Sequence, residues 1–147
     1  RTKLDGMFAS RFFDSEKIIL VKPQTFMNIS GVCVAKFKQF FKINEADIFV
    51  IYDDIDLGFG EVKIKQGGGD AGHKGVRSIS QHLQTKDFNR VRFGIGRPKT
   101  KEEVSHFVLS NFSSTERDKV SIILQTFCED FEKIIQKNTN LAIQRNI

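Results

Sequence analysis

The sequence has 147 residues, a length that suits one domain with a buried core. With 39% hydrophobic and 28% charged residues and two prolines, it falls outside the disordered, collagen-like and low-complexity classes. No apolar run approaches the roughly 20 residues of a transmembrane helix, and two cysteines are too few for a disulfide-rich secreted scaffold. We therefore expect a single domain over residues 1–147 in a reducing, intracellular compartment.

The net charge of +5 is concentrated in one part of the chain. Residues 1–60 are neutral overall, whereas residues 61–101 carry ten basic and three acidic side chains. A localised cationic segment is suited to binding phosphate or nucleic acid. A solvated surface that keeps the protein soluble is the alternative.

The first half of the chain alternates strand and helix signals. Residues 8–13 and 17–22 indicate a hairpin, with Asp14 and Ser15 in the turn. Apolar residues at helical spacing then predict a helix that begins near Asn28 or Ser30 and ends near Lys42. The apolar run 48–52 predicts a buried strand.

The second half continues this alternation. Residues 62–65 and 90–95 have the period of strands, the apolar face of residues 76–83 predicts a helix, and residues 99–103 form a charged surface loop. Ser113 and Glu116 make a capping box for a long helix that extends to Ile134. The pattern predicts an α/β sandwich with helices around one mixed, mostly parallel twisted sheet.

Three polar groups follow the expected strands, where α/β proteins place their sites. They are Asn28 in the segment after Lys22, Asp53 after the run 48–52, and His73 with Lys74 after the glycine-rich stretch Gly67–Gly72. A carboxylate such as Asp53 can orient a histidine that accepts a proton. A turn cap, or a cation site formed with Asp54 and Asp56, is the alternative.

Asn28 carries both a hydrogen-bond donor and an acceptor and could bind a peptide backbone, although an N-cap role also fits.

Lys65 and Arg92 lie on strands whose alternate residues are apolar. If these strands are neighbours, the two cations can hold one phosphate. An ordinary solvated surface is the other interpretation.

Four segments resemble the signatures of bacterial-type peptidyl-tRNA hydrolase. Residues 22–31 (KPQTFMNISG) resemble K-P-x-T-[FY]-M-N-x-S-G, and residues 53–57 (DDIDL) resemble D-D-L-D-L. Residues 67–75 resemble the G-G-x-G-G-H-N-G loop, and residues 88–98 resemble F-x-R-L-R-I-G-I-G-R-P. Four motifs in the right order make the resemblance specific.

The resemblance implies an enzyme that hydrolyses the ester between a peptide and the 3′ ribose of tRNA, without metal or organic cofactor. Asn28 would bind the peptide backbone, and Asp53 would orient a histidine that acts as general base on water. The other implied contacts with substrate and tRNA are made by Phe26, Lys65, His73, Lys74 and Arg92. Residues 67–74 would form a gate and residues 96–109 a lid.

The family places its catalytic histidine in a T-R-H-N motif near the N-terminus, and this sequence contains no such motif. We therefore expect the chain to be N-terminally incomplete and to lack the base. Lys74 stands where the family has asparagine, and Asp70-Ala71 replaces small glycines and is expected to stiffen the gate.

The alternative function is an RNA-binding protein that retains the fold without catalysis. The resemblance further implies a monomer that binds the acceptor region of tRNA. It also implies no membrane partner and a cytoplasmic location, with an organelle as the alternative.

Overall fold

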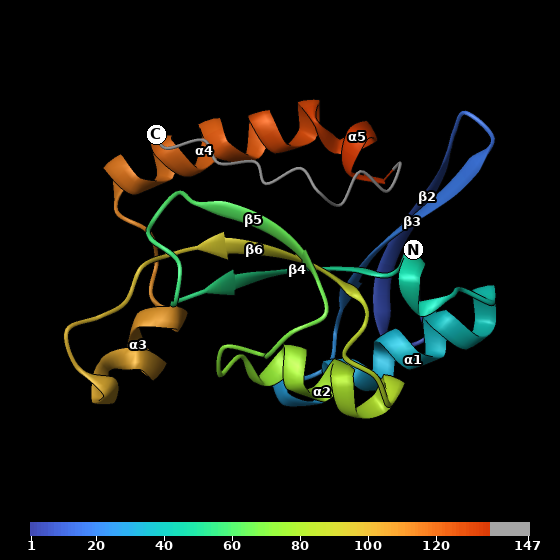
Figure 1. Ribbon diagram of the computed structural model, residues 1–147, viewed down its shortest axis with the longest axis horizontal. Helices are drawn as coiled ribbons and strands as arrows, with labels where there is room; N and C mark the ends of the chain where they lie inside the picture. Colours follow the sequence, from blue (N-terminus) through green and yellow to red (C-terminus); the bar gives the residue numbers. More distant parts are fainter. Residues whose placement is uncertain (136–147) are drawn as a thin grey trace. The chain divides into compact units, whose positions relative to one another are not determined.

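The computed structural model describes residues 1–135, which form two compact units. The first unit comprises Arg1–Ile48 and Gly68–Phe88, and the second comprises Phe49–Gly67 and residues 89–135. Each unit contains a three-stranded sheet and helices (Figure 1). The α/β class is confirmed. The single domain over residues 1–147 extends beyond the described residues and stays a prediction.

The first unit is an antiparallel sheet with two α-helices, and its strand order is β1-β2-β3. The predicted hairpin is confirmed as β2 and β3, with Asp14 and Ser15 between them. Its tip projects beyond α1 (Figure 1). The elements are β1 (Thr2–Lys3), β2 (Gly6–Phe13), β3 (Glu16–Pro23), η1 (Met27–Ile29), α1 (Ser30–Phe41), η2 (Glu45–Asp47) and α2 (Lys74–Leu83).

Aromatic rings join the hairpin to α1. Phe8 of β2 lies edge-on to Phe37 and Phe41, with ring centroids 5.4 and 6.2 Å apart. Cys33 lies on α1 and is fully buried, and burial is the main cause that raises the pKa of its thiol. This cysteine therefore belongs to the core, as its apolar neighbours in the sequence predict.

Both α-helices of the first unit end at a residue in the left-handed conformation. Lys42 follows α1 with φ 54° and Gln84 follows α2 with φ 55°. Their backbone N–H groups bond back to carbonyls of the last helical turn. Glycine is the usual residue at such a position because it has no Cβ to clash.

The second unit contains a mixed sheet of order β4-β6-β5. β4 and β6 are parallel, whereas β5 and β6 are antiparallel. The mixed sheet is as predicted, but parallel pairing does not dominate: β4–β6 is the one parallel pair among the described strands. The elements are β4 (Phe49–Asp54), β5 (Val62–Gln66), β6 (Asn89–Gly94), η3 (Lys101–Glu103), α3 (Val104–Leu109), α4 (Ser114–Glu129) and α5 (Phe131–Ile135).

The two faces of the second sheet differ in polarity. One face packs on α4 and α5 through a buried cluster of Val62, Val91, Ile123, Phe127 and Ile134. The register places the side chains of alternate residues on the opposite face, and there β5 and β6 contribute Lys63, Lys65, Arg90 and Arg92. The second unit therefore has an apolar core on one side of the sheet and a row of cations on the other.

The helices of the second unit follow the predicted signals in part. Ser113 and Glu116 form the predicted capping box at the start of α4. The long helix is interrupted at Asp130, where α4 gives way to α5. The loop expected at residues 99–103 is wrong in part, because Thr100 and Glu103 cap a short 3-10 helix there. Within residues 1–135, no helix is both long and apolar enough to cross a membrane.

Candidate active site

The candidate site residues are distributed over the two units. Phe26, Asn28, His73 and Lys74 lie in the first unit. Asp53, Lys65 and Arg92 lie in the second.

In the first unit, Asn28 lies in η1, immediately before α1. The helix starts at Ser30, whose hydroxyl donates to the carbonyl oxygen of Met27 at 2.9 Å. Ile29 is the N-cap, so Asn28 does not cap the helix. Its side chain is exposed and makes no hydrogen bond within the part of the chain that the structure describes. The N-cap alternative for Asn28 is therefore wrong, and its amide remains available to a ligand.

The start of α1 is held against α2 by a short contact that the sequence did not reveal. The backbone N–H of Gly31 donates to Ser78 Oγ at 2.9 Å, and Ser78 is buried. A Cβ on Gly31 would lie 2.2 Å from the carbonyl oxygen of Ser78, so only glycine fits at this crossing. Figure 1 shows α1 and α2 side by side. Ser78 carries no signal of its own in the sequence beyond its place next to the apolar positions of α2.

The same helix pair positions the glycine-rich loop. His73 is the N-cap of α2, and its Nδ1 accepts from the backbone N–H groups of Gly75 and Val76 at 3.1 and 3.3 Å. A Cβ on Gly75 would lie 2.6 Å from Met27 Sδ, so η1 approaches the start of α2 closely. The segment that carries Asn28 and the residues around His73 are thus neighbours within one unit.

Asp70 organises the loop before His73. Its Oδ1 accepts from the backbone N–H of Gly72 at 2.9 Å, and its Oδ2 accepts from Arg77 Nε at 2.9 Å. The hydrogen bond from Arg77 is the main cause that lowers the pKa of Asp70. These bonds tie the loop to α2, and the stiffening expected from Asp70-Ala71 stays a prediction.

In the second unit, Asp53 and Asp54 are the last residues of β4. They are consecutive, so their side chains lie on opposite faces of the sheet. Asp53 is half-buried, whereas Asp54 is 1% exposed. Both belong to the strand, although the sequence placed the acidic run after it.

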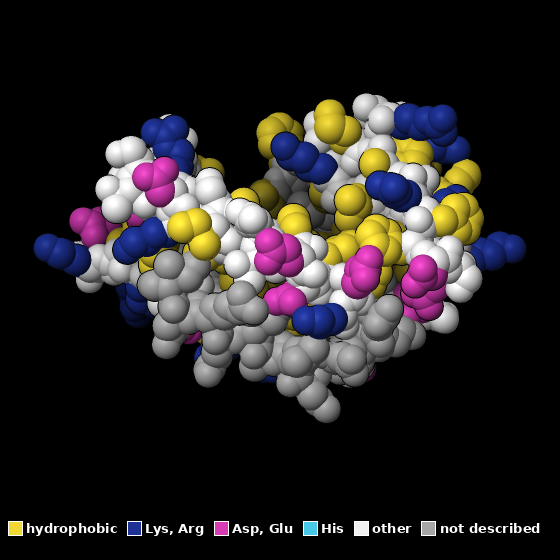
Figure 2. Space-filling model, turned by 90° about the horizontal axis from the view of Figure 1, so that it is seen from above, with side chains coloured by type: hydrophobic (Ala, Val, Ile, Leu, Met, Phe, Trp, Pro, Cys, Tyr) yellow, Lys and Arg dark blue, Asp and Glu magenta, His cyan; other side chains and the backbone are white. Residues whose placement is uncertain are grey.

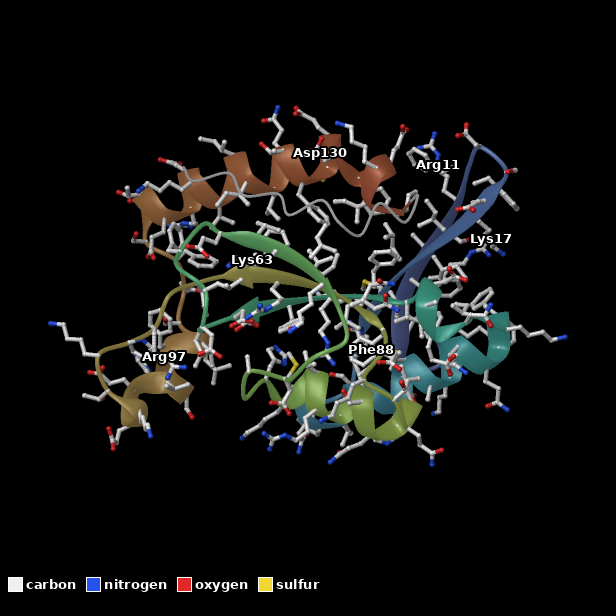
Figure 3. The ribbon with its side chains drawn as sticks, viewed as in Figure 1. Arg11, Lys17, Lys63, Phe88, Arg97 and Asp130 are labelled. Carbon is white, nitrogen blue, oxygen red and sulfur yellow. The ribbon has the colours of Figure 1, made fainter. Side chains whose placement is uncertain are left out.

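Asp54 and Asp56 each pair with an arginine. Asp54 Oδ2 accepts from Arg92 Nε at 2.7 Å, and Asp56 pairs with Arg97 at the start of the segment that leads to α3 (Figure 3). Within residues 1–135, no cluster of three or more acidic, histidine or cysteine side chains could hold a metal ion. The cation-site alternative for Asp53, Asp54 and Asp56 therefore receives no support.

The strands that carry Lys65 and Arg92 are neighbours. Lys65 of β5 lies opposite Arg90 of β6, and Lys63 lies opposite Arg92. Lys65 and Arg92 are thus diagonal neighbours on one face of the sheet, and the Cα atoms of such neighbours are about 7–8 Å apart. Lys65 is exposed and Arg92 is partly exposed. Figure 3 shows Lys63 on the same strand, β5.

Tyr52 occupies the same face of the sheet between these charges. It lies opposite Arg92 in the β4–β6 register and is buried. Burial is the main cause that raises the pKa of its phenol, and a hydrogen bond with Arg90 acts in the opposite direction. Tyr52 is therefore neutral near pH 7, and it places an uncharged side chain opposite Arg92 in the sheet.

Figure 2 shows one face of the molecule, on which Lys and Arg side chains lie among hydrophobic, acidic and polar ones.

Residues 1–146 match the family model for peptidyl-tRNA hydrolase. The chain belongs to the peptidyl-tRNA hydrolase family. It is 42% identical over 143 residues to the peptidyl-tRNA hydrolase of Citrifermentans bemidjiense, covering 97% of this chain and 76% of that protein. The corresponding protein of Oceanobacillus iheyensis is 39% identical over 145 residues, with 99% and 78% covered. The enzyme class predicted from the four motifs is confirmed.

The fold leads to the same family. The crystal structure of peptidyl-tRNA hydrolase from Acinetobacter baumannii superposes with a TM-score of 0.88 at 31% identity, covering 95% of this chain and 71% of that one. A crystal structure of a peptidyl-tRNA hydrolase in complex with N-propanol also gives a TM-score of 0.88. These similarities establish the family and its fold, whereas the roles of Asn28, Asp53 and the other site residues stay predictions.

Proposed function

We propose peptidyl-tRNA hydrolysis as the function: the ester bond between peptide and tRNA is cleaved, which releases tRNA for reuse in translation, when a histidine is present to act as the base. The observation that carries the proposal is the match of residues 1–146 to the peptidyl-tRNA hydrolase family. The two units supply different parts of the chemistry. The first offers exposed neutral groups to the peptide and the tRNA end, and the second offers a carboxylate and a row of cations.

Asp53 is the proposed partner of the catalytic histidine. A carboxylate that accepts from one imidazole nitrogen holds the ring in one tautomer, so that the other nitrogen can take a proton from water. The resulting hydroxide attacks the ester carbonyl, and the 3′ oxygen of the ribose leaves as a hydroxyl after it takes the proton back from the imidazolium. The half-buried end of β4 suits this role, because Asp54 faces the other side of the sheet and engages Arg92 there.

Asn28 and Phe26 are the proposed contacts of the first unit. The amide of Asn28 can accept from and donate to a peptide group adjacent to the ester. Phe26 precedes it and is 82% exposed, which leaves its ring open to stacking on a base. His73 and Lys74, at the start of α2, complete this surface. Lys74 has three donors and no acceptor, so we propose a phosphate contact for it.

Lys65 and Arg92 are the proposed phosphate ligands of the second unit. They share one face of the β5–β6 pair, and the exposed Lys65 makes no ion pair within the described residues. An ammonium and a guanidinium at this spacing can contact one phosphate or two consecutive phosphates. The acceptor region of tRNA is the nucleic-acid partner that this arrangement supports.

A protein that binds RNA without hydrolysing it is the second candidate. It is favoured by Lys74, which stands where the family has asparagine. His73 is a poor substitute for the base, because its Nδ1 already accepts two backbone N–H groups. The exposed amide of Asn28 and the position of Asp53 favour the enzyme.

Single-turnover hydrolysis of a labelled peptidyl-tRNA by this chain, with a tRNA-binding titration beside it, separates the two candidates. A second sample carries a T-R-H-N segment joined to the N-terminus. We expect tRNA binding in both samples and hydrolysis in the second. Hydrolysis by the chain alone would assign the base to a histidine among these residues. Binding without hydrolysis in both samples would favour the RNA-binding protein.

We also propose that the protein acts as a monomer in the cytoplasm. The family resemblance supports both statements. Light scattering after size-exclusion chromatography is expected to give the mass of one chain, and a mass of two chains would contradict the proposal.

A further inference from the structure

Asp54 is a buried carboxylate whose two oxygens serve two different parts of the second unit. Its Oδ2 accepts from Arg92 Nε at 2.7 Å, and its Oδ1 accepts from the backbone N–H of Asp56 at 2.7 Å. The side chain of Asp54 has no exposed surface, whereas that of Arg92 is 21% exposed. A buried charge is tolerated when it is paired in this way, and it becomes costly when the partner is removed.

The ion pair leaves most of the Arg92 guanidinium available. An arginine has five N–H donors, of which only the one on Nε is used by Asp54 in this contact. The four donors on the terminal nitrogens form the fork that binds a phosphate in bidentate fashion. Tyr52 and Lys63 lie opposite Arg92 on the two neighbouring strands, so a neutral ring and a second cation share this face of the sheet with Arg92.

We propose that Asp54 is a positioning residue that fixes Arg92 for phosphate binding before tRNA arrives. The inference rests on the proposed role of Arg92 as a phosphate ligand. A free arginine side chain loses rotamer freedom when it binds, whereas one already anchored through Nε has lost that freedom during folding. Because Oδ1 also holds the turn at Asp56, the same carboxylate fixes the backbone that follows Asp53.

The direction in which Asp54→Asn changes the affinity for tRNA distinguishes a positioning role from a purely electrostatic one. Asp54→Asn keeps the size of the side chain and an oxygen for the Asp56 N–H but removes a negative charge beside Arg92. Electrostatics alone would then make tRNA bind more tightly, because a partner of a phosphate ligand has been neutralised. Positioning predicts weaker binding, because the guanidinium is no longer held by a charged partner.

The experiment measures the dissociation constant of unacylated tRNA with the full chain over a series of salt concentrations. The variants are Asp54→Asn, Arg92→Gln and the double variant, with Asp118→Asn as a control of equal charge change on the exposed surface of α4. Thermal unfolding followed by circular dichroism shows that each variant is folded. Positioning predicts about three- to tenfold weaker binding for Asp54→Asn, which is of the order of the net contribution of one ordinary hydrogen bond.

The remaining variants complete the test. Arg92→Gln is expected to weaken binding at least as much and to lower the salt dependence by about one phosphate contact. The double variant is expected to bind no more weakly than Arg92→Gln, and Asp118→Asn to stay within about twofold of the wild type. Unchanged or tighter binding by Asp54→Asn, with weaker binding by Arg92→Gln, overturns the positioning role and leaves the phosphate role intact.

Two further outcomes are decisive. If Arg92→Gln changes neither the affinity nor the salt dependence, the proposed phosphate role of Arg92 is wrong, and the positioning role with it. If Asp54→Asn does not fold, Arg92→Lys replaces it, because lysine keeps the charge and a partner for Asp54 but has no fork. Positioning of the guanidinium fork predicts that Arg92→Lys binds more weakly than the wild type although the charge is kept, and binding equal to the wild type overturns it.

Discussion

The two units hold their candidate site residues in different ways. In the first unit, backbone contacts do the positioning: Gly31 N–H bonds to Ser78, and His73 caps α2. The side chain of Asn28 is left exposed. In the second unit, the charged side chains position one another, since Arg92 is bound to the buried Asp54. Removing the Asn28 side chain can therefore spare the stability of the first unit, whereas removing the Arg92 side chain leaves a buried carboxylate of the second unit without its partner.

The largest expected effect is on hydrolysis, from Asp53→Asn. The variant keeps a side chain of the same size but cannot stabilise an imidazolium, so turnover should fall by about 100-fold or more. The measurement is single-turnover hydrolysis of peptidyl-tRNA by the form that carries the T-R-H-N segment. Asp118→Asn, with the same change of charge on α4, serves as the control. Turnover within a few-fold of the wild type would contradict the role of Asp53.

Asn28→Ala tests whether a site residue of the first unit contributes to activity without contributing to stability. Its amide makes no hydrogen bond within the described residues, so the free energy of unfolding should change by less than about 0.5 kcal/mol. Loss of the substrate contact should reduce hydrolysis by roughly 10- to 100-fold. Asn44→Ala, which removes another exposed amide of the same unit, is the matched control. A loss of stability equal to the loss of activity would show that Asn28 has a structural role.

Gly31→Ala tests whether the backbone crossing holds the first unit together. The added Cβ would lie 2.2 Å from the Ser78 carbonyl oxygen and 2.6 Å from His82 Nδ1, so α1 and α2 must move apart. Overpacking of this kind typically costs about 1–3 kcal/mol, which urea denaturation measures. Gly69→Ala is the control, because a Cβ on Gly69 meets no atom within 4 Å. Equal stability of the two variants would argue against a tight crossing.

Lys65→Ala examines the exposed cation of the second unit. Because Lys65 makes no ion pair within the described residues, the variant should be as stable as the wild type within about 0.5 kcal/mol. Its affinity for tRNA should fall several-fold, and the slope of the affinity against salt should decrease by about 0.7–0.9. Binding titrations at several salt concentrations measure both. An unchanged slope would exclude Lys65 from the phosphate contacts.

The smallest expected effect concerns the ion pair of Asp70 with Arg77, one of the ion pairs of the first unit. The pKa of Asp70 is lowered in the folded state, chiefly by its hydrogen bond with Arg77. Ionised Asp70 therefore stabilises the fold at pH values above 3.8, the ordinary pKa of this carboxyl. That contribution is lost as the pH falls through the lowered pKa. The stability difference between wild type and Asp70→Asn should be below about 1 kcal/mol at neutral pH, because the pair is exposed, and should vanish in strong acid. A difference that persists at low pH would contradict this account.

The sequence predicts local features of this fold better than it predicts partners. The hairpin, the strand predicted at residues 62–65 and the capping box at Ser113 depend on neighbours in the chain, and the structure has all three. The sequence does not predict α3, because a helix of six residues has too few turns to show a helical period of apolar residues. The division into two units was also not visible in the sequence, because no change of composition marks it.

The site shows the same limit. Asp53 and Asp54 are adjacent acids at a strand end, and only the register of β4 against β6 reveals that Asp54 meets Arg92. A contact between residues 38 positions apart is set by the fold. The row of cations could be predicted from alternation on each strand, but their pairing across the strands required the observed register.

The helix ends of the first unit leave stability unused. Lys42 and Gln84 both adopt positive φ, a conformation in which a Cβ crowds the following carbonyl. Glycine at either position would relieve that crowding, and each replacement is worth about 1 kcal/mol in favourable cases. Lys42→Gly and Gln84→Gly lie at the surface and alter none of the proposed ligand contacts. An engineer seeking a more robust protein could therefore strengthen the unit that carries Asn28 without touching its chemistry.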